Sequence, residues 1–312
     1  MLRAEFHSSI SAISPATWDG LFSSHNPFIQ HGFLLALEES ACVSAASGWD
    51  PCHLLLLEGE RPVAAMPLYL KAHSYGEFVF DWGWAEAYER FGLDYYPKLT
   101  TAVPFTPSAG PRIGIKAGTD TQSVISALCQ SVQKRAEAAG ASGWHLLFPE
   151  ASAEVDAEFR DAGMLGRKDV QFHWFNHGYQ DFDDYLAVLR SSRRKNLKRE
   201  RKAVAQQGIS MERLSGAEIT AEAWSAFYQC YCRTYLKRSG HSGYLSRDFF
   251  DQLLMTQADS LMLVVAKSDD TIVATSLFFQ DTQRLYGRYW GALEHVDYLH
   301  FEACFYQGIE YC

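Results

Sequence analysis

Apolar residues gather in two hairpin-like segments, one in each half of the chain. Residues 53–57 and 62–71 are apolar runs separated by the turn Glu58-Gly59-Glu60, and residues 262–279 repeat this arrangement. Placing Val273-Ala274 on Val63-Ala64 aligns the two hairpins without gaps. Further along, Tyr286-Gly287 meets Tyr75-Gly76, one residue out of step. The order of elements also repeats, which favours an internal duplication over a chance likeness of two hairpins.

The remaining pattern predicts alternating helices and strands. Helical spacing marks residues 15–22, 28–39, 122–139 and 153–162, and strand-like runs mark residues 1–13, 75–81, 144–148 and 170–175. Each half therefore combines helices with a mostly antiparallel hairpin, and the predicted fold class is α/β, of the α+β kind. We expect two domains, at residues 1–170 and 171–312, with a packed boundary between them.

One strongly basic stretch follows the predicted boundary. Residues 190–202 contain eight basic side chains and one acid, so the stretch carries +7. Since the whole chain carries −9, all other residues together carry −16. The spacing predicts a helix over residues 190–207, whose apolar stripe includes Leu197, Val204 and also Arg193. A helix break with Ser192 as N-cap is the alternative, and it would shift this register.

A single cationic helix on an acidic protein suggests one anionic ligand group, such as a phosphate. Arg194, Lys198 and Arg201 share one helical face, so several cations can converge, and arginine can grip phosphate bidentately. The candidate phosphate-binding residues are Arg193, Arg194, Lys198 and Arg201. The competing interpretation is a solvated helix whose long cationic side chains bind no ligand.

Composition restricts the class of protein. Apolar residues make up 47% of the 312, which indicates a globular chain, and no apolar run reaches the roughly 20 residues of a membrane span. Seven cysteines without a CxxC pair suggest reduced thiols, hence a cytoplasmic protein. We expect no metal site, because His173 and His177 lie on a predicted strand where their spacing does not converge. The acidity argues against DNA as a partner, and the oligomeric state carries no signal.

Three aromatic-rich stretches carry a family resemblance. They are PLYLKAHSYGEFVFDWGWAEAY with GLDYYPKL and PFTPSAGPR, then QFHWFNHGY leading into SSRRKNLKRER, and LYGRYWGALEHVDYLHFEACFYQGIEY. They closely resemble the FemAB-like peptidoglycan biosynthesis/recognition proteins, a branch of the GNAT acyltransferase superfamily. The resemblance, from about residue 15 to residue 312, implies a bacterial transferase with tandem GNAT-like subdomains. It also implies acyl or aminoacyl transfer to an amine, possibly of a cell-wall precursor, from acyl-CoA such as acetyl-CoA or from aminoacyl-tRNA.

Two departures from the family pattern bear on this expectation. Acyl-CoA-using members of the superfamily have a glycine-patterned loop at a helix start, whose backbone N–H groups hold the pyrophosphate. Here the second half offers only ALEHVDYLHFE, and the first half a loose approximation at residues 109–114. Relatives also continue beyond residue 312, which falls inside a helical pattern. The second GNAT-like domain is therefore expected to be truncated at its C-terminus.

Acyl transfer needs a group that accepts the amine proton and a donor for the oxyanion or leaving group. Two clusters supply these residue types. In the first half they are His73, Tyr75, Glu77, Asp81, Trp82 and Trp84, and in the second half Tyr286, Arg288, Tyr289, Trp290, His300 and Glu302. If residues 75–81 form a strand, Tyr75, Glu77 and Asp81 share one face; Tyr286, Arg288 and Trp290 likewise share a face of a second strand.

We assign the catalytic roles to Asp81, Glu302 and Tyr286, with the other cluster members as substrate-binding residues. Structural tyrosines and tryptophans with satisfied polar tips are the alternative for many of these positions, and the charged members could pair with one another. At the level of the whole chain, the alternative to an acyltransferase is a degenerate GNAT pair that binds a cell-wall precursor without turnover. The missing glycine loop favours this binding module, and the paired acid–tyrosine clusters favour the enzyme.

Overall fold

The computed structural model describes residues 2–23, 25–150 and 153–312, and the chain forms two compact units. Unit 1 comprises Met1–Lys168 and Tyr244–Leu253, and unit 2 comprises Asp169–Gly243 and Leu254–Cys312. The segment Tyr244–Leu253 belongs to unit 1 although it lies deep in the second half of the sequence, a placement that local patterning did not indicate. The domain boundary between residues 170 and 171 stays a prediction.

Unit 1 is built on a four-stranded sheet with the order β1-β3-β4-β7. Its strands are β1 (Leu2–His7), β3 (His53–Glu58), β4 (Arg61–Met66) and β7 (Gly114–Ile115). The predicted hairpin is confirmed as the antiparallel pair β3–β4, in which Leu56 lies opposite Ala64. β1 is shorter than the predicted 1–13, and Met1 lies outside the described residues.

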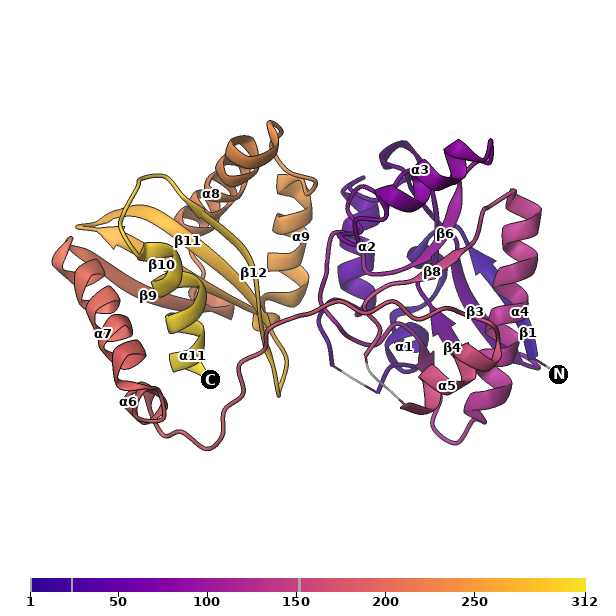
Figure 1. Cartoon of the computed structure of the whole chain (residues 1–312), viewed down its shortest axis with the longest axis horizontal. Helices are drawn as coiled ribbons and strands as arrows, with labels where there is room; N and C mark the ends of the chain where they lie inside the picture. The colour runs from indigo at the N-terminus through magenta and orange to yellow at the C-terminus, as the bar shows by residue number, and fades with distance from the viewer. Residues whose placement is uncertain (1, 24, 151–152) are drawn as a thin grey trace. The chain divides into compact units, whose positions relative to one another are not determined.

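Three helices of unit 1 lie beside this sheet (Figure 1). They are α1 (Pro15–Asp19) and α2 (His31–Glu39), between β1 and β3, and α4 (Thr121–Ala139), after β7. Asp120 caps α4 by accepting a hydrogen bond from Ser123 N, and Gly140 ends it in the left-handed region at φ 63°. The apolar face of α4 enters the core of unit 1 through Val124, Ile125, Leu128 and Val132.

A second sheet of unit 1 has the order β2-β5-β6-β8. Its strands are β2 (Trp49–Pro51), β5 (Tyr69–Lys71), β6 (Lys98–Thr101) and β8 (Trp144–Leu146); α3 (Trp82–Arg90) lies between β5 and β6, and α5 (Ala153–Asp161) follows β8. The strand predicted at 75–81 is wrong, because this segment is irregular and Gly76, Phe78 and Phe80 all have positive φ. That backbone cannot alternate its side chains as a strand does.

Unit 2 repeats the main sheet of unit 1. Its strands are β9 (Ile209–Ser215), β10 (Leu261–Ser268), β11 (Thr271–Gln280) and β12 (Leu285–Ala292), in the order β12-β11-β10-β9. Two helices, α8 (Ala221–Ser239) and α9 (Arg247–Gln257), lie between β9 and β10, as α1 and α2 lie between β1 and β3. Ala266 pairs with Ala274 in unit 2, as Leu56 pairs with Ala64 in unit 1. Each residue of the unit 2 pair lies 210 positions after its counterpart in unit 1. The predicted duplication of the hairpin is confirmed in both topology and register.

Two details of the predicted repeat are wrong. β12, which contains Tyr286-Gly287, pairs with β11 at the place where β7 pairs with β4, so its counterpart is β7 and not the segment at Tyr75-Gly76. The strand predicted at 170–175 is irregular in the structure. The segments at residues 75–76 and 170–175 contain aromatic residues, which favour a strand in a sequence-based prediction. In the structure neither segment is a strand.

Helices cover both faces of the unit 2 sheet. They include α6 (Phe182–Ala187), α7 (Ser191–Gln206), α10 (Leu299–Phe301) and α11 (Gln307–Tyr311), with the π-helical turn η5 (Glu302–Tyr306) between the last two. The 3₁₀ turns are η1 (Ile10–Ala12) and η2 (Ala45–Ser47) in unit 1, and η3 (Gly216–Glu218) and η4 (Ala258–Ser260) in unit 2. α8 packs so closely on β12 that a Cβ on Gly291 would lie 2.0 Å from Cys230 O. Glycine is therefore required there.

Within residues 2–23, 25–150 and 153–312, no helix is both long and apolar enough to cross a membrane. In the same residues, no three His, Cys, Asp or Glu side chains come together as a possible metal site.

Candidate functional site

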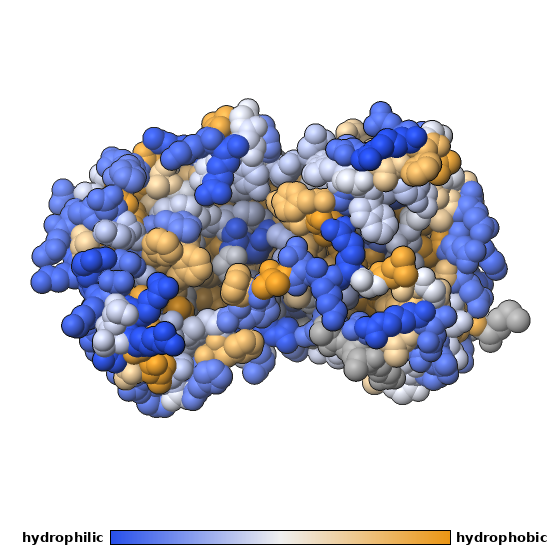
Figure 2. All heavy atoms as spheres, in the orientation of Figure 1, coloured by the Kyte–Doolittle hydropathy of each residue, from blue (hydrophilic) through white to orange (hydrophobic). Residues whose placement is uncertain are grey.

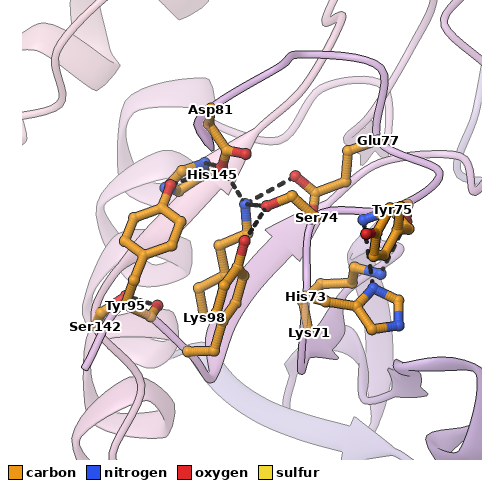
Figure 3. Close-up of polar contacts among 11 residues, drawn as sticks. Lys71, His73, Ser74, Tyr75, Glu77, Asp81, Tyr95, Lys98, Ser142 and His145 are labelled. Carbon is orange, nitrogen blue, oxygen red and sulfur yellow. Dashed lines mark hydrogen bonds and ion pairs between the residues drawn. The ribbon is translucent and has the colours of Figure 1, made fainter. Parts of the chain in front are cut away.

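The centre of the candidate site is a buried lysine that the sequence analysis did not select. Lys98, at the start of β6, is fully buried, and its ammonium group donates hydrogen bonds to three side chains of the segment 72–81 (Figure 3). The acceptors are Ser74 Oγ at 2.9 Å, Glu77 Oε2 at 2.8 Å and Asp81 Oδ2 at 2.5 Å. Both carboxylates are also buried, so Lys98 supplies the positive charge that they require. Glu77 and Asp81 thus meet at Lys98 from an irregular segment and not from one face of the predicted strand.

Asp81 has two further neighbours, Tyr95 and His145. Tyr95 Oη donates to Asp81 Oδ2 at 2.6 Å, and His145 Nδ1 lies 3.9 Å from the same oxygen. Tyr95 Oη also lies 3.4 Å from His145 Nε2. His145 belongs to β8, and its side chain is 23% exposed, whereas that of Asp81 is fully buried. Of these three residues, His145 is therefore the one that solvent or a substrate can reach.

Burial and charge give these groups different protonation states. Burial raises the pKa of Asp81, but hydrogen bonds from Lys98 and Tyr95 outweigh it and bring the pKa to about 2. Burial and the charge of Lys98 lower the pKa of His145 to about 4. Burial raises the pKa of Glu77. At neutral pH, Asp81 is an anion and His145 a neutral imidazole that can accept a proton.

A second lysine, Lys71 at the end of β5, lies in the same region but has weaker partners. Its ammonium group lies 3.6 Å from the ring centroid of Trp49 and donates to Tyr75 O at 3.4 Å. Burial, reinforced by the charge of Lys98 and opposed by that of Glu77, lowers the pKa of Lys71 to about 7. Lys71 is thus the member of the cluster whose charge changes near neutral pH.

The aromatic residues predicted in the first half lie largely at the surface of unit 1. Tyr75 is 55% exposed, and its ring contacts those of His73, at 5.2 Å between centroids, and Trp82, at 5.4 Å. Trp84 is also exposed, but it lies two residues further along α3 and packs near Arg167, with 5.9 Å between the guanidinium carbon and the ring centroid. The structure therefore groups His73, Tyr75 and Trp82 into one row of rings.

In unit 2 the predicted base Glu302 is paired with the predicted phosphate ligand Arg201. Glu302 is buried, and it accepts hydrogen bonds from Arg201 Nη2 at 3.0 Å and Arg201 Nε at 3.1 Å. Glu302 also accepts from Gln307 at 2.8 Å, and Arg201 reaches Glu310 at 3.0 Å. The pair ties α7 to the segment that follows β12. Catalysis by Glu302 and phosphate binding by Arg201 stay predictions, and each would have to compete with this pair.

The other basic candidates lie on α7, whose predicted helix is confirmed with its N-cap at Arg190. Arg194 donates to the carbonyl of Ala187 at 3.1 Å at the end of α6, and Lys198 lies 2.9 Å from Asp183. Arg193 is exposed. The face that carries Arg194, Lys198 and Arg201 is thus turned toward groups of unit 2 itself, and phosphate binding there stays a prediction.

The candidates on β12 do not all share one face, because the strand contains a bulge. Gly287 pairs with Phe278 and Tyr289 pairs with Leu277, so Arg288 is the additional residue between them. Tyr286 faces Phe279 and Tyr289 faces Leu277, whereas Trp290 faces Ser276 and so lies on the other side of the sheet. The expected common wall of Tyr286, Arg288 and Trp290 is therefore wrong.

Local contacts place each of these β12 candidates. Tyr286 Oη donates to Asp281 at 3.0 Å, and the Arg288 guanidinium lies 5.0 Å from the Tyr289 ring centroid. The Trp290 ring lies 5.4 Å from the imidazole of His300. The structure therefore brings together Trp290 with His300 and Arg288 with Tyr289, while Tyr286 is engaged by a neighbouring loop.

Unit 1 also contains a cavity of about 1100 Å³ at the start of α4. Its lining includes the loop 116–120 and two cations, Arg61 and Lys116, but four carboxylates: Glu58, Asp120, Glu158 and Asp161. Asp120 already occupies the helix start through Ser123 N at 3.0 Å. With four carboxylates against two cations, these residues do not fit the pyrophosphate of acyl-CoA. None of Lys98, Asp81 or His145 lines this cavity.

Four residues of this cluster were not predicted from the sequence: Lys71, Tyr95, Lys98 and His145. A lysine in an apolar strand pattern is the signal that could have found the two lysines, because a charge on a buried strand requires partners. Tyr95 and His145 have no such local signal. They reach Asp81 only because β6 and β8 are neighbours in the second sheet, and this pairing joins residues far apart in the sequence.

Comparison with known proteins places the chain in a family. The FemAB-like family, described as peptidoglycan biosynthesis/recognition, matches residues 9–312. None of the curated proteins matches the chain. A conserved protein of unknown function from Bacteroides thetaiotaomicron has a similar structure, with a TM-score of 0.50, 10% identity, and coverage of 98% of this chain and 86% of that chain.

Two further solved structures are similar at lower scores. A tandem GNAT protein from the clavulanic acid biosynthesis pathway has a TM-score of 0.47 and 12% identity, covering 100% of this chain and 85% of its own. FemX has a TM-score of 0.43 and 11% identity, covering 86% of this chain and 75% of its own. Identities this low bear on the fold alone. The fold is mixed α/β, and the four-stranded main sheet of unit 1 is repeated in unit 2.

Proposed function

Because this chain belongs to the FemAB-like family of peptidoglycan biosynthesis/recognition proteins, we propose that it is an N-acyltransferase acting on an amine of a peptidoglycan precursor. The observation that carries the proposal is the cluster of Asp81, Lys98, Tyr95 and His145 in unit 1. It combines a fixed anion with a partly exposed neutral imidazole, a combination that suits removal of a proton from an attacking amine.

The transfer step assigns one role to each group. The neutral amine of the acceptor attacks the carbonyl carbon of the acyl donor, and the bond from that carbon to sulfur or oxygen breaks. The electron pair of this bond leaves with the sulfur or oxygen, which takes up a proton from water, and the nitrogen loses a proton. His145 accepts this proton. Asp81, 3.9 Å away, stabilises the resulting imidazolium, and Lys98 and Tyr95 hold Asp81 in place. Asp81 thus acts by positioning and charge and not as the base, because its side chain is fully buried, whereas that of His145 is 23% exposed.

The donor is a thioester such as acetyl-CoA or an ester such as aminoacyl-tRNA. Since the cavity at α4 does not fit the pyrophosphate of CoA, no step is assigned to it. We propose a cytoplasmic location, where both kinds of donor occur. The free thiols of all seven cysteines are in keeping with this location.

A mass-spectrometric donor screen tests the proposal. The protein is incubated with a muramyl pentapeptide precursor and, in parallel, acetyl-CoA or a mixture of aminoacyl-tRNAs. The expected result is a precursor that gains the mass of one acyl or aminoacyl group with one donor. An unchanged precursor with every donor would overturn the proposal.

A second candidate function is a binding module without turnover. It is favoured by a specific observation: both carboxylates predicted as bases are ion-paired, Asp81 with Lys98 and Glu302 with Arg201. In this case the precursor raises the melting temperature by binding the folded state, while its mass stays unchanged. A change in the mass of the precursor therefore distinguishes the two functions, whereas a rise in melting temperature does not.

A further inference from the structure

Lys71 has a setting that is unusual for a charged side chain. Hydrophilic residues cover much of the face shown in Figure 2, where water solvates them, whereas Lys71 is fully buried. Among the residues that the structure describes it forms no ion pair. Its nitrogen has only the carbonyl oxygen of Tyr75, at 3.4 Å, and the ring of Trp49, with the centroid at 3.6 Å. These partners do not offset the cost of burying an ammonium charge, so near pH 7 a large fraction of the amine is neutral and nucleophilic.

Trp49, Lys71 and Lys98 form a row across three neighbouring strands of the second sheet. Trp49 on β2 lies opposite Lys71 on β5, which lies opposite Lys98 on β6. Directly opposed residues share one face of a sheet, and all three side chains are fully buried. Lys98 thus brings a cation to one side of Lys71. On the other side, Trp49 Nε1–H is buried and has no acceptor among the described residues. A cation and an unused donor on the two adjoining strands favour an anion at Lys71.

Full burial limits how an anion can come to this place. Neither Lys71 nor Trp49 has exposed surface, and an ion that entered from water would lose its hydration. Carbon dioxide is small, uncharged and apolar, and it reacts with a neutral amine but not with an ammonium group. We propose that Lys71 is a carbamylation site, where carbon dioxide adds to the buried amine and becomes an anionic carbamate.

The proton that this reaction releases has an acceptor in the same cluster. Nζ of Lys71 uses its electron pair to bond the carbon of carbon dioxide, one C=O electron pair moves onto an oxygen, and one proton passes from Nζ to the Glu77 carboxylate. Glu77 is the charged group that acts most strongly on Lys71, and burial raises the pKa of Glu77. Its Oε1 has no hydrogen-bond partner in the described part of the chain and can carry the proton. Since Lys98 and Asp81 keep their charges, the net charge of the buried cluster does not change.

The carbamate gives each of these groups a partner. Its negative charge lies on the strand opposite Lys98, so two opposed lysines become a pair of opposite charges. Trp49 Nε1–H and the protonated Glu77 Oε1 are the donors available to its oxygens. His73, the other titratable group that the charge of Lys71 affects, is a neutral ring because burial lowers its pKa. No acyl donor takes part, so the inference goes beyond the proposed function and does not rest on it.

Carbon-13 NMR of the whole protein in carbon-13-labelled bicarbonate at about pH 8 tests the inference. We expect the wild type to show a carbamate carbonyl signal, separate from the signals of bicarbonate and dissolved carbon dioxide, which Lys71→Met and Lys71→Gln both lack. Lys195→Met, which removes an exposed lysine of α7, should keep the signal. Trp49→Phe keeps a ring but removes the N–H, and it should lower the carbamylated fraction about tenfold at low bicarbonate. Bicarbonate should also raise the melting temperature of the wild type more than sodium chloride of equal ionic strength does.

Four results would overturn the inference. They are a wild type without a carbamate signal, a signal of equal size after loss of the Lys71 amine, an unchanged carbamylated fraction in Trp49→Phe, and equal stabilisation by bicarbonate and chloride. The last would identify a site for a free anion. Since the samples contain no acyl donor, none of these results bears on the proposed acyltransferase, and a failed acyl-transfer assay leaves the carbamate untouched.

Discussion

Lys71 and Lys98 lie directly opposite each other on the antiparallel strands β5 and β6, and both side chains are fully buried. Like charges in this arrangement destabilise a sheet. The two ammonium groups have partners of different strength. Lys98 donates to the carboxylates of Glu77 and Asp81, whereas Lys71 donates to the carbonyl oxygen of Tyr75 and lies over the ring of Trp49. Lys98 therefore organises the segment 72–81, and Lys71 is the lysine that can lose its proton.

Replacing Lys98 should destabilise the protein far more than replacing Lys71. Lys98→Met leaves two buried carboxylates without their cation, and we expect a loss of about 3–5 kcal/mol in the free energy of unfolding. Lys71→Met, the matched control on the neighbouring strand, removes a buried amine with weak partners and should cost less than about 1 kcal/mol. Urea unfolding of both variants measures the difference. Equal losses would contradict the assignment of both acids to Lys98.

The stability difference between Lys71→Met and the wild type should depend on pH. Burial lowers the pKa of Lys71 to about 7 in the folded state, from 10.5. Between these values the unfolded chain binds more protons, so this group makes the wild type more stable as pH rises from 7 to 10.5. The variant lacks this dependence. Its free energy of unfolding relative to the wild type should therefore be highest near pH 6 and fall toward pH 9.5. A difference that is the same at both pH values would exclude a depressed pKa.

Arg201 should matter for stability more than its neighbours on α7. Arg201→Lys cannot reproduce the bonds from Nε and Nη2 to Glu302, so we expect a loss of about 1–3 kcal/mol in thermal or urea unfolding. Arg199→Lys is the control, since Arg199 is exposed, and its effect should stay within about 0.5 kcal/mol. Similar effects from both substitutions would mean that the Arg201–Glu302 pair contributes little to the fold.

Substitution of the two predicted acids separates the roles of the units. Asp81→Asn keeps the shape but removes the charge that stabilises an imidazolium at His145, and turnover should fall about a hundredfold or more. Glu302→Gln should lower stability and leave turnover per folded molecule close to that of the wild type. Steady-state rates, normalised by the folded fraction from melting curves, check both. Loss of turnover only in Glu302→Gln would move catalysis to unit 2.

The repeated hairpin could be predicted because its cause is local. An apolar run, a turn and a second run specify β3–β4 and β10–β11, and the aligned sequence correctly places the one hairpin on the other. The segment 72–81 could not be predicted in this way. Its aromatic residues favour a strand, but positive φ values at Phe78 and Phe80 depend on tertiary contacts, among them the bonds to Lys98.

Part of the candidate site could be predicted because its signal is local, and the rest could not because it depends on strand pairing. Charged Glu77 and Asp81 among aromatic residues indicated a polar cluster, yet its partners come from β6 and β8, which no periodicity connects to them. On β12, one extra residue in the bulge near Arg288 reverses the faces of the side chains before it. Alternation alone cannot show where such a residue is inserted.

The most direct test of the acyltransferase account is the rate of acyl transfer by His145→Gln. The substitution keeps a polar side chain but removes the proton acceptor next to Asp81. We expect kcat/KM, measured by mass spectrometry as formation of the acylated precursor, to fall about a hundredfold or more. The melting temperature should not change. His295→Gln is the control, because the His295 side chain is 92% exposed and lies in unit 2, and it should keep the wild-type rate. A His145→Gln protein that transfers the acyl group at the wild-type rate would contradict the account.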